Sequence, residues 1–132
     1  MGAGGIRRMN FEIQGRLSSL NEYISACRTN PYKGAQLKKE QQEIVAWEIM
    51  RARLDGYLKP VTKPCTINFE YSEKKFKRDL DNISGFAHKV ILDALVETGT
   101  LPDDTYKWVT GFTDSFYESE KEYITVTIKE CE

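Results

Sequence analysis

The sequence contains one histidine and three cysteines among 132 residues, and neither residue type has the spacing of metal ligands. The cysteines are Cys27, Cys65 and Cys131, and their odd number argues against a disulfide framework. We expect free thiols in a reducing compartment. No apolar run approaches the roughly 20 residues of a membrane helix. No apolar stretch follows the basic residues 2–8 either, so a secretory signal is not expected.

The composition is that of an ordinary globular protein, with 40% hydrophobic, 11% aromatic and 30% charged residues. This balance excludes a disordered chain, and the length suits one domain with its own core. Residues 1–8 are rich in glycine, and we expect them to be a leader or a remnant of cloning. The domain itself is predicted to span residues 9–132.

The near-zero net charge conceals an uneven distribution along the chain. Residues 1–78 carry 15 basic and 8 acidic side chains, whereas residues 79–132 carry 4 basic and 12 acidic ones. One explanation is a dipolar surface without functional meaning. The other is a basic surface for a polyanion beside an acidic site that a cation neutralises.

Hydrophobic periodicity and turn residues predict two kinds of element. Alternation of apolar and polar residues predicts strands over residues 9–15 and 65–71. The last two strands are predicted over residues 106–113 and 123–128. Helices are predicted from near Leu20, over 35–54 and over 82–97, with a loop over 28–34 between the first two. Ile44, Val45, Trp47 and Ile49 are expected to begin the apolar packing of the long helix, and Gly99 to end the last helix.

The main elements therefore follow the order β-α-β-α-β-β. Helical crossovers favour parallel pairing of the first three strands, and the short link before residue 123 favours an antiparallel hairpin of the last two. The predicted fold is a two-layer α/β (α+β) domain with a mixed four-stranded sheet and helices on one face.

Acidic residues flank the last predicted helix on both sides. Asp79 and Asp81 precede it, two positions apart at what we expect to be a strand exit, so that both carboxylates point to one side. Asp103 and Asp104 follow it in a turn. The sequence alone does not establish that the two groups converge. Caps and solvated turns are the simpler explanation, since Asp81 or Asn82 can cap the helix.

If the carboxylates do converge, they need a cation. Two like charges about 4 Å apart repel by roughly 4 kcal/mol at an effective dielectric constant of 20. Ligation by oxygen alone, without cysteine or histidine, favours a hard cation such as Mg²⁺ or Mn²⁺. Such an ion polarises a phosphodiester and activates the attacking water.

These residues form an ordered set that resembles a known family. The run Arg78-Asp79-Leu80-Asp81-Asn82, a downstream lysine, Asp93-Ala94-Leu95, Gly99 and Asp103-Asp104 is similar to the RusA-type Holliday junction resolvases. The resemblance covers about residues 66–128. It implies a small homodimeric, Mg²⁺-dependent endonuclease of phages, prophages and bacteria, and therefore a cytoplasmic location in a bacterial or phage-infected cell.

The resemblance also implies roles for individual residues. Asp79 and Asp81 match the family's first two metal carboxylates, Asp104 matches the third, and Lys89 matches the catalytic lysine by its spacing to Asp93. The chain departs from the short form of the family by four residues, since six residues separate Asn82 from Lys89 where that form has two. His88, the neighbour of Lys89, is therefore a second candidate, although a solvated or hydrogen-bonded histidine is its simpler explanation.

A basic run leads directly into the acidic residues. Lys74, Lys75, Lys77 and Arg78 are four cations within five positions, which favours phosphate binding over a merely solvated edge. We expect Asp93 to be structural. The two tryptophans, Trp47 and Trp108, are expected in the core or in a dimer contact.

Together these patterns predict a Mg²⁺-dependent endodeoxyribonuclease that cleaves branched DNA such as four-way junctions. A junction has two symmetric scissile strands, which suits a two-fold homodimer. Two alternatives remain open. One is a nucleic-acid-binding module without catalysis, whose aspartates only cap and turn, and the other is a partner-binding protein without a nucleic-acid role.

Overall fold

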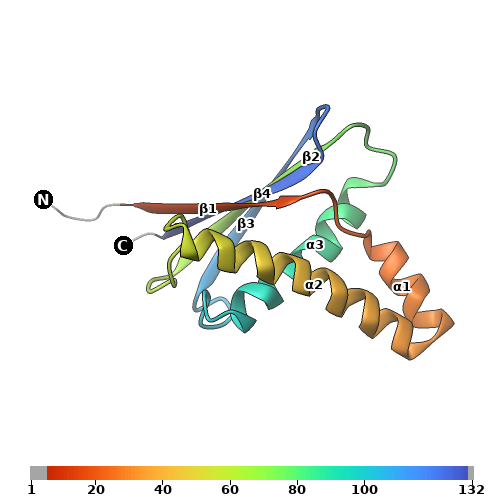
Figure 1. Ribbon diagram of the computed structural model, residues 1–132, viewed down its shortest axis with the longest axis horizontal. Helices are drawn as coiled ribbons and strands as arrows, with labels where there is room; N and C mark the ends of the chain where they lie inside the picture. Colours follow the sequence, from red (N-terminus) through yellow and green to blue (C-terminus); the bar gives the residue numbers. More distant parts are fainter. Residues whose placement is uncertain (1–5, 131–132) are drawn as a thin grey trace, which may run out of the picture.

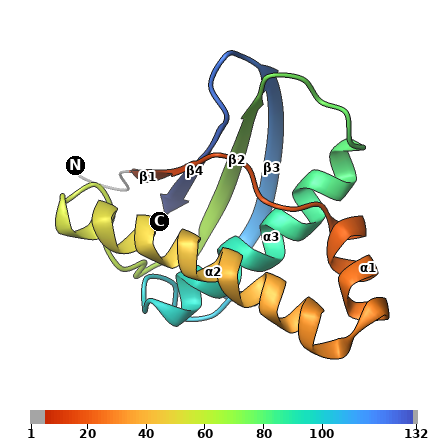
Figure 2. The same cartoon turned by 45° about the vertical axis from the view of Figure 1, so that its right-hand side comes forward.

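The computed structural model describes residues 6–130 and shows seven elements (Figure 1). They are, in chain order, β1 (Arg7–Gln14), α1 (Leu20–Thr29), α2 (Pro31–Leu54), β2 (Cys65–Glu73), α3 (Leu80–Glu97), β3 (Val109–Glu118) and β4 (Tyr123–Glu130). The predicted α+β class with a mixed four-stranded sheet is confirmed. The helices lie together on one face of the sheet (Figure 2).

The predicted hairpin of the last two strands is wrong. The strand order is β1-β4-β2-β3, so β4 lies between β1 and β2 and is antiparallel to both, while β3 pairs in parallel with β2 at the sheet edge. Burial explains this order. Ile124, Val126 and Ile128 of β4 are all buried, as a central strand requires, whereas most residues of β3 are exposed or half-buried.

The third strand also begins later than the sequence predicts. Residues 105–108 form a turn, in which the Trp108 and Val109 N–H groups donate to the Thr105 carbonyl at 2.9 Å. The strand then runs to Glu118, five residues beyond the predicted end at Thr113. This shift brings Asp114 into the sheet, opposite Phe69 of β2.

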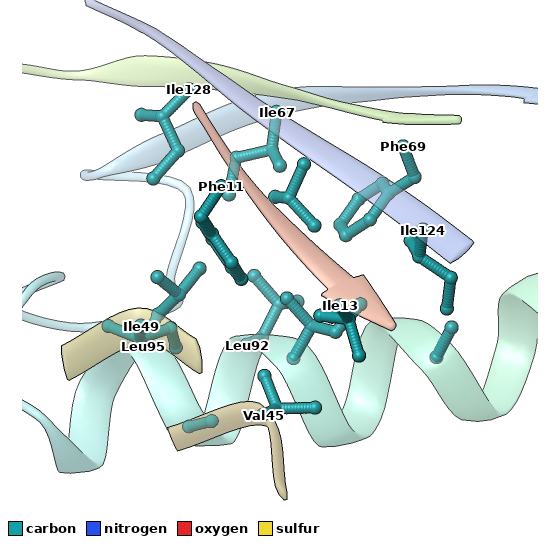
Figure 3. Packing of buried hydrophobic residues seen from close by; sticks show 14 of the residues in the cluster. Phe11, Ile13, Val45, Ile49, Ile67, Phe69, Leu92, Leu95, Ile124 and Ile128 are labelled. Carbon is teal, nitrogen blue, oxygen red and sulfur yellow. The ribbon is translucent and has the colours of Figure 1, made fainter. Parts of the chain in front are cut away.

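The core fills the space between the sheet and the helices (Figure 3). Phe11 and Ile13 of β1, together with Ile67 and Phe69 of β2, are buried against the side chains of α3 and α2. The apolar face of α2 differs from the prediction. Val45 and Ile49 are buried, but Ile44 and Trp47 are exposed. At about 100° per residue, Trp47 lies about 160° around the helix from both buried residues, and Ile44 lies about 100° from Val45 and about 140° from Ile49.

A single residue connects α1 and α2, where the sequence predicts a loop over residues 28–34. Asn30 caps α2, since its side chain accepts a hydrogen bond from the Tyr32 N–H at 2.8 Å. Pro31 occupies the first helical position, where a missing N–H costs nothing. The predicted start of α1 is confirmed, because Ser19 and Glu22 form a complete capping box.

The two ends of the described chain meet in the sheet. Arg7 and Arg8, predicted as part of a leader, are the first residues of β1 and pair with Glu130 and Lys129 of β4. Residues 1–5 of that predicted leader lie outside the described residues, as does Cys131. Cys27 is a free thiol. No helix within residues 6–130 has the length and apolar character needed to cross a membrane.

Glu130 of β4 contacts both β1 and the segment before β2, and these contacts depend on its ionised carboxylate. The carboxylate is buried, pairs with Arg7, and accepts from the N–H groups of Thr62 at 2.7 Å and Lys63 at 3.2 Å. Burial raises the pKa of Glu130, but the hydrogen bonds from Arg7 and the two N–H groups outweigh it and lower the pKa below 4.5.

We expect Glu130→Gln to lower the free energy of unfolding at neutral pH by roughly 2–3 kcal/mol. The lowered pKa means that the contribution of Glu130 is complete above the pKa of the unfolded chain. It is lost as the pH falls through the lower folded-state pKa. Urea denaturation of both proteins should therefore show a gap that closes in acid. Glu12→Gln, at an exposed position of β1, is the matched control, and an equal effect of both substitutions would contradict the assignment.

Candidate functional site

Asp79 and Asp81 lie at the start of α3 and not at a strand exit. The strand β2 ends at Glu73, and Asp79 is the N-cap residue of a helix that begins at Leu80. The Asp79 side chain makes no capping hydrogen bond, and Asp81 occupies the first turn. The predictions of a shared strand face and of a cap by Asp81 or Asn82 are therefore wrong. A negative charge is nevertheless favourable here because of the helix dipole.

Asp103 and Asp104 lie in the turn between α3 and β3 and are exposed. They differ in what their carboxylates do. The Asp103 carboxylate accepts a hydrogen bond from the Asp104 N–H at 2.8 Å and so stabilises the turn. Within residues 6–130, the carboxylates of Asp79, Asp81 and Asp104 make no hydrogen bond or ion pair.

The helix α3 holds the two acidic groups apart within one chain. Asp81 lies in its first turn, and Asp103 and Asp104 follow its last residue, Glu97. The 16 residues from Asp81 to Glu97 span about 24 Å of helix. Figure 2 shows α3 crossing the molecule, with its two ends far apart in that view. Accordingly, no group of three or more potential metal ligands occurs among the described residues of the single chain.

The two candidate basic residues on α3 have different surroundings. Lys89 is exposed, and its ammonium group has no partner within the described chain. The His88 side chain is 23% exposed, and its Nε2 lies 2.9 Å from Oδ1 of Asp114 on β3. Its ring centroid lies 4.5 Å from that of Phe69 and 5.0 Å from that of Phe112. His88 therefore connects α3 to the edge strand.

Asp114 and Tyr71 complete this arrangement, and the sequence analysis missed both. The Tyr71 hydroxyl donates to the same Asp114 oxygen at 2.9 Å. Burial raises the pKa of Tyr71 far above its ordinary value, and the neighbouring Asp114 carboxylate raises it further. Tyr71 therefore acts as a hydrogen-bond donor at every physiological pH. Phe112, Asp114 and Phe116 are two positions apart, a spacing that would have placed Asp114 on the same strand face as the two phenylalanines. The predicted strand ended at Thr113, before this spacing was complete.

Arg78 and the three lysines of the basic run have distinct environments. The Arg78 guanidinium donates to Glu73 Oε2 at 2.7 Å and to the Leu17 carbonyl at 3.0 Å, and its side chain is mostly buried. Glu73 itself is buried. The ammonium groups of Lys74, Lys75 and Lys77 are exposed and have no partner within the described chain. Arg78 thus anchors the loop that presents the lysines at the N-terminus of α3.

Other predicted site neighbours have structural roles. Asp93 forms an ion pair with Lys38 of α2 at 2.5 Å, which supports the expectation that Asp93 is structural. Trp108 packs against the core, whereas Trp47 is 68% exposed on α2 and is not a core residue.

No protein-family model matches this chain, and no curated protein matches its sequence.

Proposed function

We propose that the protein is a metal-dependent endodeoxyribonuclease that cleaves branched DNA, with Asp79, Asp81 and Asp104 as its metal ligands. The observation that carries this proposal is the state of these three carboxylates. All three are exposed, and none is used by a cap, a turn or an ion pair of the described chain. The neighbouring Asp103, in contrast, serves its turn. All three carboxylates are therefore available to bind a cation, although the helix dipole also favours a negative charge at Asp79 and Asp81.

A site with all three carboxylates requires two chains. One copy presents Asp79 and Asp81 at the start of α3, and the other copy supplies Asp104 from beyond the end of its own α3. A two-fold homodimer contains two such sites, which suits the two symmetric scissile strands of a four-way junction. An isologous arrangement also makes the two sites identical.

The donor set fits a hard cation, because it consists only of carboxylate oxygens and leaves room for water and a phosphate oxygen. When bound, Mg²⁺ would polarise the scissile phosphate and lower the pKa of a bound water. The chain's own residues would do the rest. The carboxylates orient the water, the positive end of the α3 dipole favours the phosphate, and Lys89 stabilises the negative charge that develops during cleavage.

The three exposed lysines are expected to hold the DNA backbone. Replacing Lys74, Lys75 and Lys77 by alanine should weaken binding to junction and linear duplex alike. Since each phosphate contact releases counterions, the slope of log K against log salt should become less negative by about 2–3 units. Titrations at several salt concentrations measure this slope. Lys59, Lys63 and Lys129 provide a control triple variant elsewhere on the chain, and equal slopes for both triple variants would contradict the assignment.

Cleavage of a synthetic four-way junction, with and without Mg²⁺ and beside linear duplex, tests the proposal. The expected result is paired nicks in the junction that depend on Mg²⁺ and do not occur in the duplex. Tight, salt-sensitive binding without cleavage at any metal concentration would instead favour a non-catalytic nucleic-acid-binding module. The absence of salt-sensitive binding would favour a protein without a nucleic-acid role.

A further inference from the structure

The outer face of α2 carries large apolar side chains that residues 6–130 do not cover. Ile44 is 51% exposed, Trp47 68% and Leu54 83%. The opposite side of the same helix packs into the core through Val45 and Ile49, which are buried. A surface helix normally directs polar residues to water, and apolar side chains gathered on its exposed side are typical of a protein–protein contact.

An acidic hollow lies beside the tryptophan on this face. The hollow has a volume of about 440 Å³, and its lining residues are Glu40, Glu43, Ile44, Trp47 and Glu48. Glu48 is already paired, since Arg51 lies 3.3 Å away and the Glu48 side chain is only 13% exposed. The two other carboxylates therefore determine the charge that the hollow presents to a partner.

Glu40 and Glu43 are exposed, and neither forms an ion pair within the described residues. Glu40 accepts a hydrogen bond from the neutral Gln36 amide at 3.1 Å, and Glu43 has no hydrogen bond in this part of the chain. At about 100° per residue, Glu40 and Glu43 lie within about 40° of Trp47 around the helix. The face thus combines exposed apolar surface with two free negative charges and an aromatic ring, which also attracts cations.

We propose that this face of α2 binds an amphipathic helical segment of another protein, one that combines apolar side chains with lysine or arginine. The face is formed by residues 40, 43, 44, 47, 50 and 54. The apolar side chains of the segment cover Trp47, Met50 and Leu54, and its cations lie beside Glu40 and Glu43. A helix suits this position because it satisfies its own N–H and C=O groups, whereas an extended segment finds no backbone partners on a helix surface.

The charges select a basic protein segment over other occupants. A second copy of the chain would bring two acidic faces together, and Glu40 and Glu43 repel the phosphates of a nucleic acid. Helices that bind membrane surfaces carry lysine and arginine beside their apolar residues, which is the opposite sign. The nearby basic residues do not change this balance, since Arg51 pairs with Glu48 and Lys39 does not line the hollow. The inference does not rest on the proposed nuclease activity.

Fluorescence anisotropy of a labelled synthetic peptide, titrated with the full chain without DNA or metal, tests the proposal. The peptide has about 18 residues, enough to span the face, with leucines along one side and lysines flanking them. It should bind saturably, and the same peptide with glutamate in place of lysine should not. Trp47→Ala should weaken binding at least about tenfold, because it removes the central aromatic contact. Tyr106→Ala, at an exposed aromatic residue outside α2, is the matched control and should bind as the wild type does.

Charge substitutions test the choice of partner. Glu43→Gln should weaken binding about threefold and reduce its salt dependence, whereas Glu120→Gln, an exposed carboxylate between β3 and β4, should change neither. The double variant Glu40→Lys/Glu43→Lys should bind the acidic peptide in place of the basic one. Circular dichroism shows whether each variant keeps its helices.

Several results would overturn the proposal. They are no saturable binding of the basic peptide, equal binding of both peptides to the wild type, unchanged affinity in Trp47→Ala, or an unchanged preference in the double lysine variant. A lower sedimentation mass of Trp47→Ala without peptide would assign the face to a second copy instead. Binding of the wild type, but not of Trp47→Ala, to phosphatidylglycerol vesicles would assign it to a membrane surface. Loss of DNA cleavage in any of these variants bears on the nuclease proposal and not on this one.

Discussion

Two inactive variants, Asp81→Asn and Asp104→Asn, are expected to regain junction cleavage when they are allowed to form mixed dimers. The reason is the length of α3, since Asp81 lies in its first turn and Asp104 follows its last residue within one chain. If each site combines Asp79 and Asp81 of one copy with Asp104 of the other, a mixed dimer contains one site with both substitutions. Its second site contains neither.

Each variant alone should lose at least about a thousandfold in cleavage rate, because a missing metal carboxylate affects both sites of its dimer. Random mixing makes half of the dimers mixed, and each mixed dimer has one intact site. Nicking should therefore recover to about a quarter of the wild-type rate. Co-refolding of the two variants, followed by denaturing gel analysis of a labelled junction, measures the recovery.

The pair Asp79→Asn and Asp81→Asn supplies the matched control. Both residues belong to the same half-site, so every site of their mixed dimer carries one substitution and no recovery is expected. Recovery in neither mixture would show that the sites are not shared between chains. Full activity of all three single variants would contradict the metal site itself. Junction binding and thermal unfolding should change little in every case, since the helix dipole loses at most about 1 kcal/mol per charge.

The sequence predicts most elements because local patterns determine them. Alternation of apolar residues identifies β1, β2 and β4, the capping box identifies the start of α1, and Gly99, with a positive φ of 73°, ends α3 as expected. Strand order is a different matter. The link between β3 and β4 is short, but β4 has the more continuous apolar face and takes the central position between β1 and β2.

The candidate site illustrates the same limit. The sequence places Asp79 and Asp81 near the start of α3 and Asp103 and Asp104 after its end, since the helix is a local structure, but it misplaces the first pair at a strand exit. Whether the acidic residues at the two ends of α3 come together depends on how two copies of the chain are arranged, and no spacing within one sequence specifies that arrangement. The contact of His88 with Asp114 could not be predicted from the sequence either, because it depends on where β3 ends and on the register of β3 with β2.

Lys89→Met is expected to lower the cleavage rate about a hundredfold, the usual loss when one group that stabilises developing charge is removed. Lys89 lies eight residues after Asp81, about 12 Å along the helix and about 80° around it. Its exposed side chain has no partner in the described chain, so the substitution should leave the melting temperature and Mg²⁺ affinity nearly unchanged.

His88→Ala should show the opposite pattern. Loss of the hydrogen bond to Asp114 and of the ring contacts with Phe69 and Phe112 should lower the free energy of unfolding by roughly 1–2 kcal/mol. Cleavage below the melting temperature should fall far less than in Lys89→Met, because the wild-type His88 ring binds Asp114 of β3 and has a structural role in the proposed mechanism. Single-turnover cleavage and thermal unfolding, measured on both variants, separate the two roles. An inactive His88→Ala and a fully active Lys89→Met would assign the chemistry to the histidine, and the four additional residues before Lys89 would then have moved the lysine out of the site.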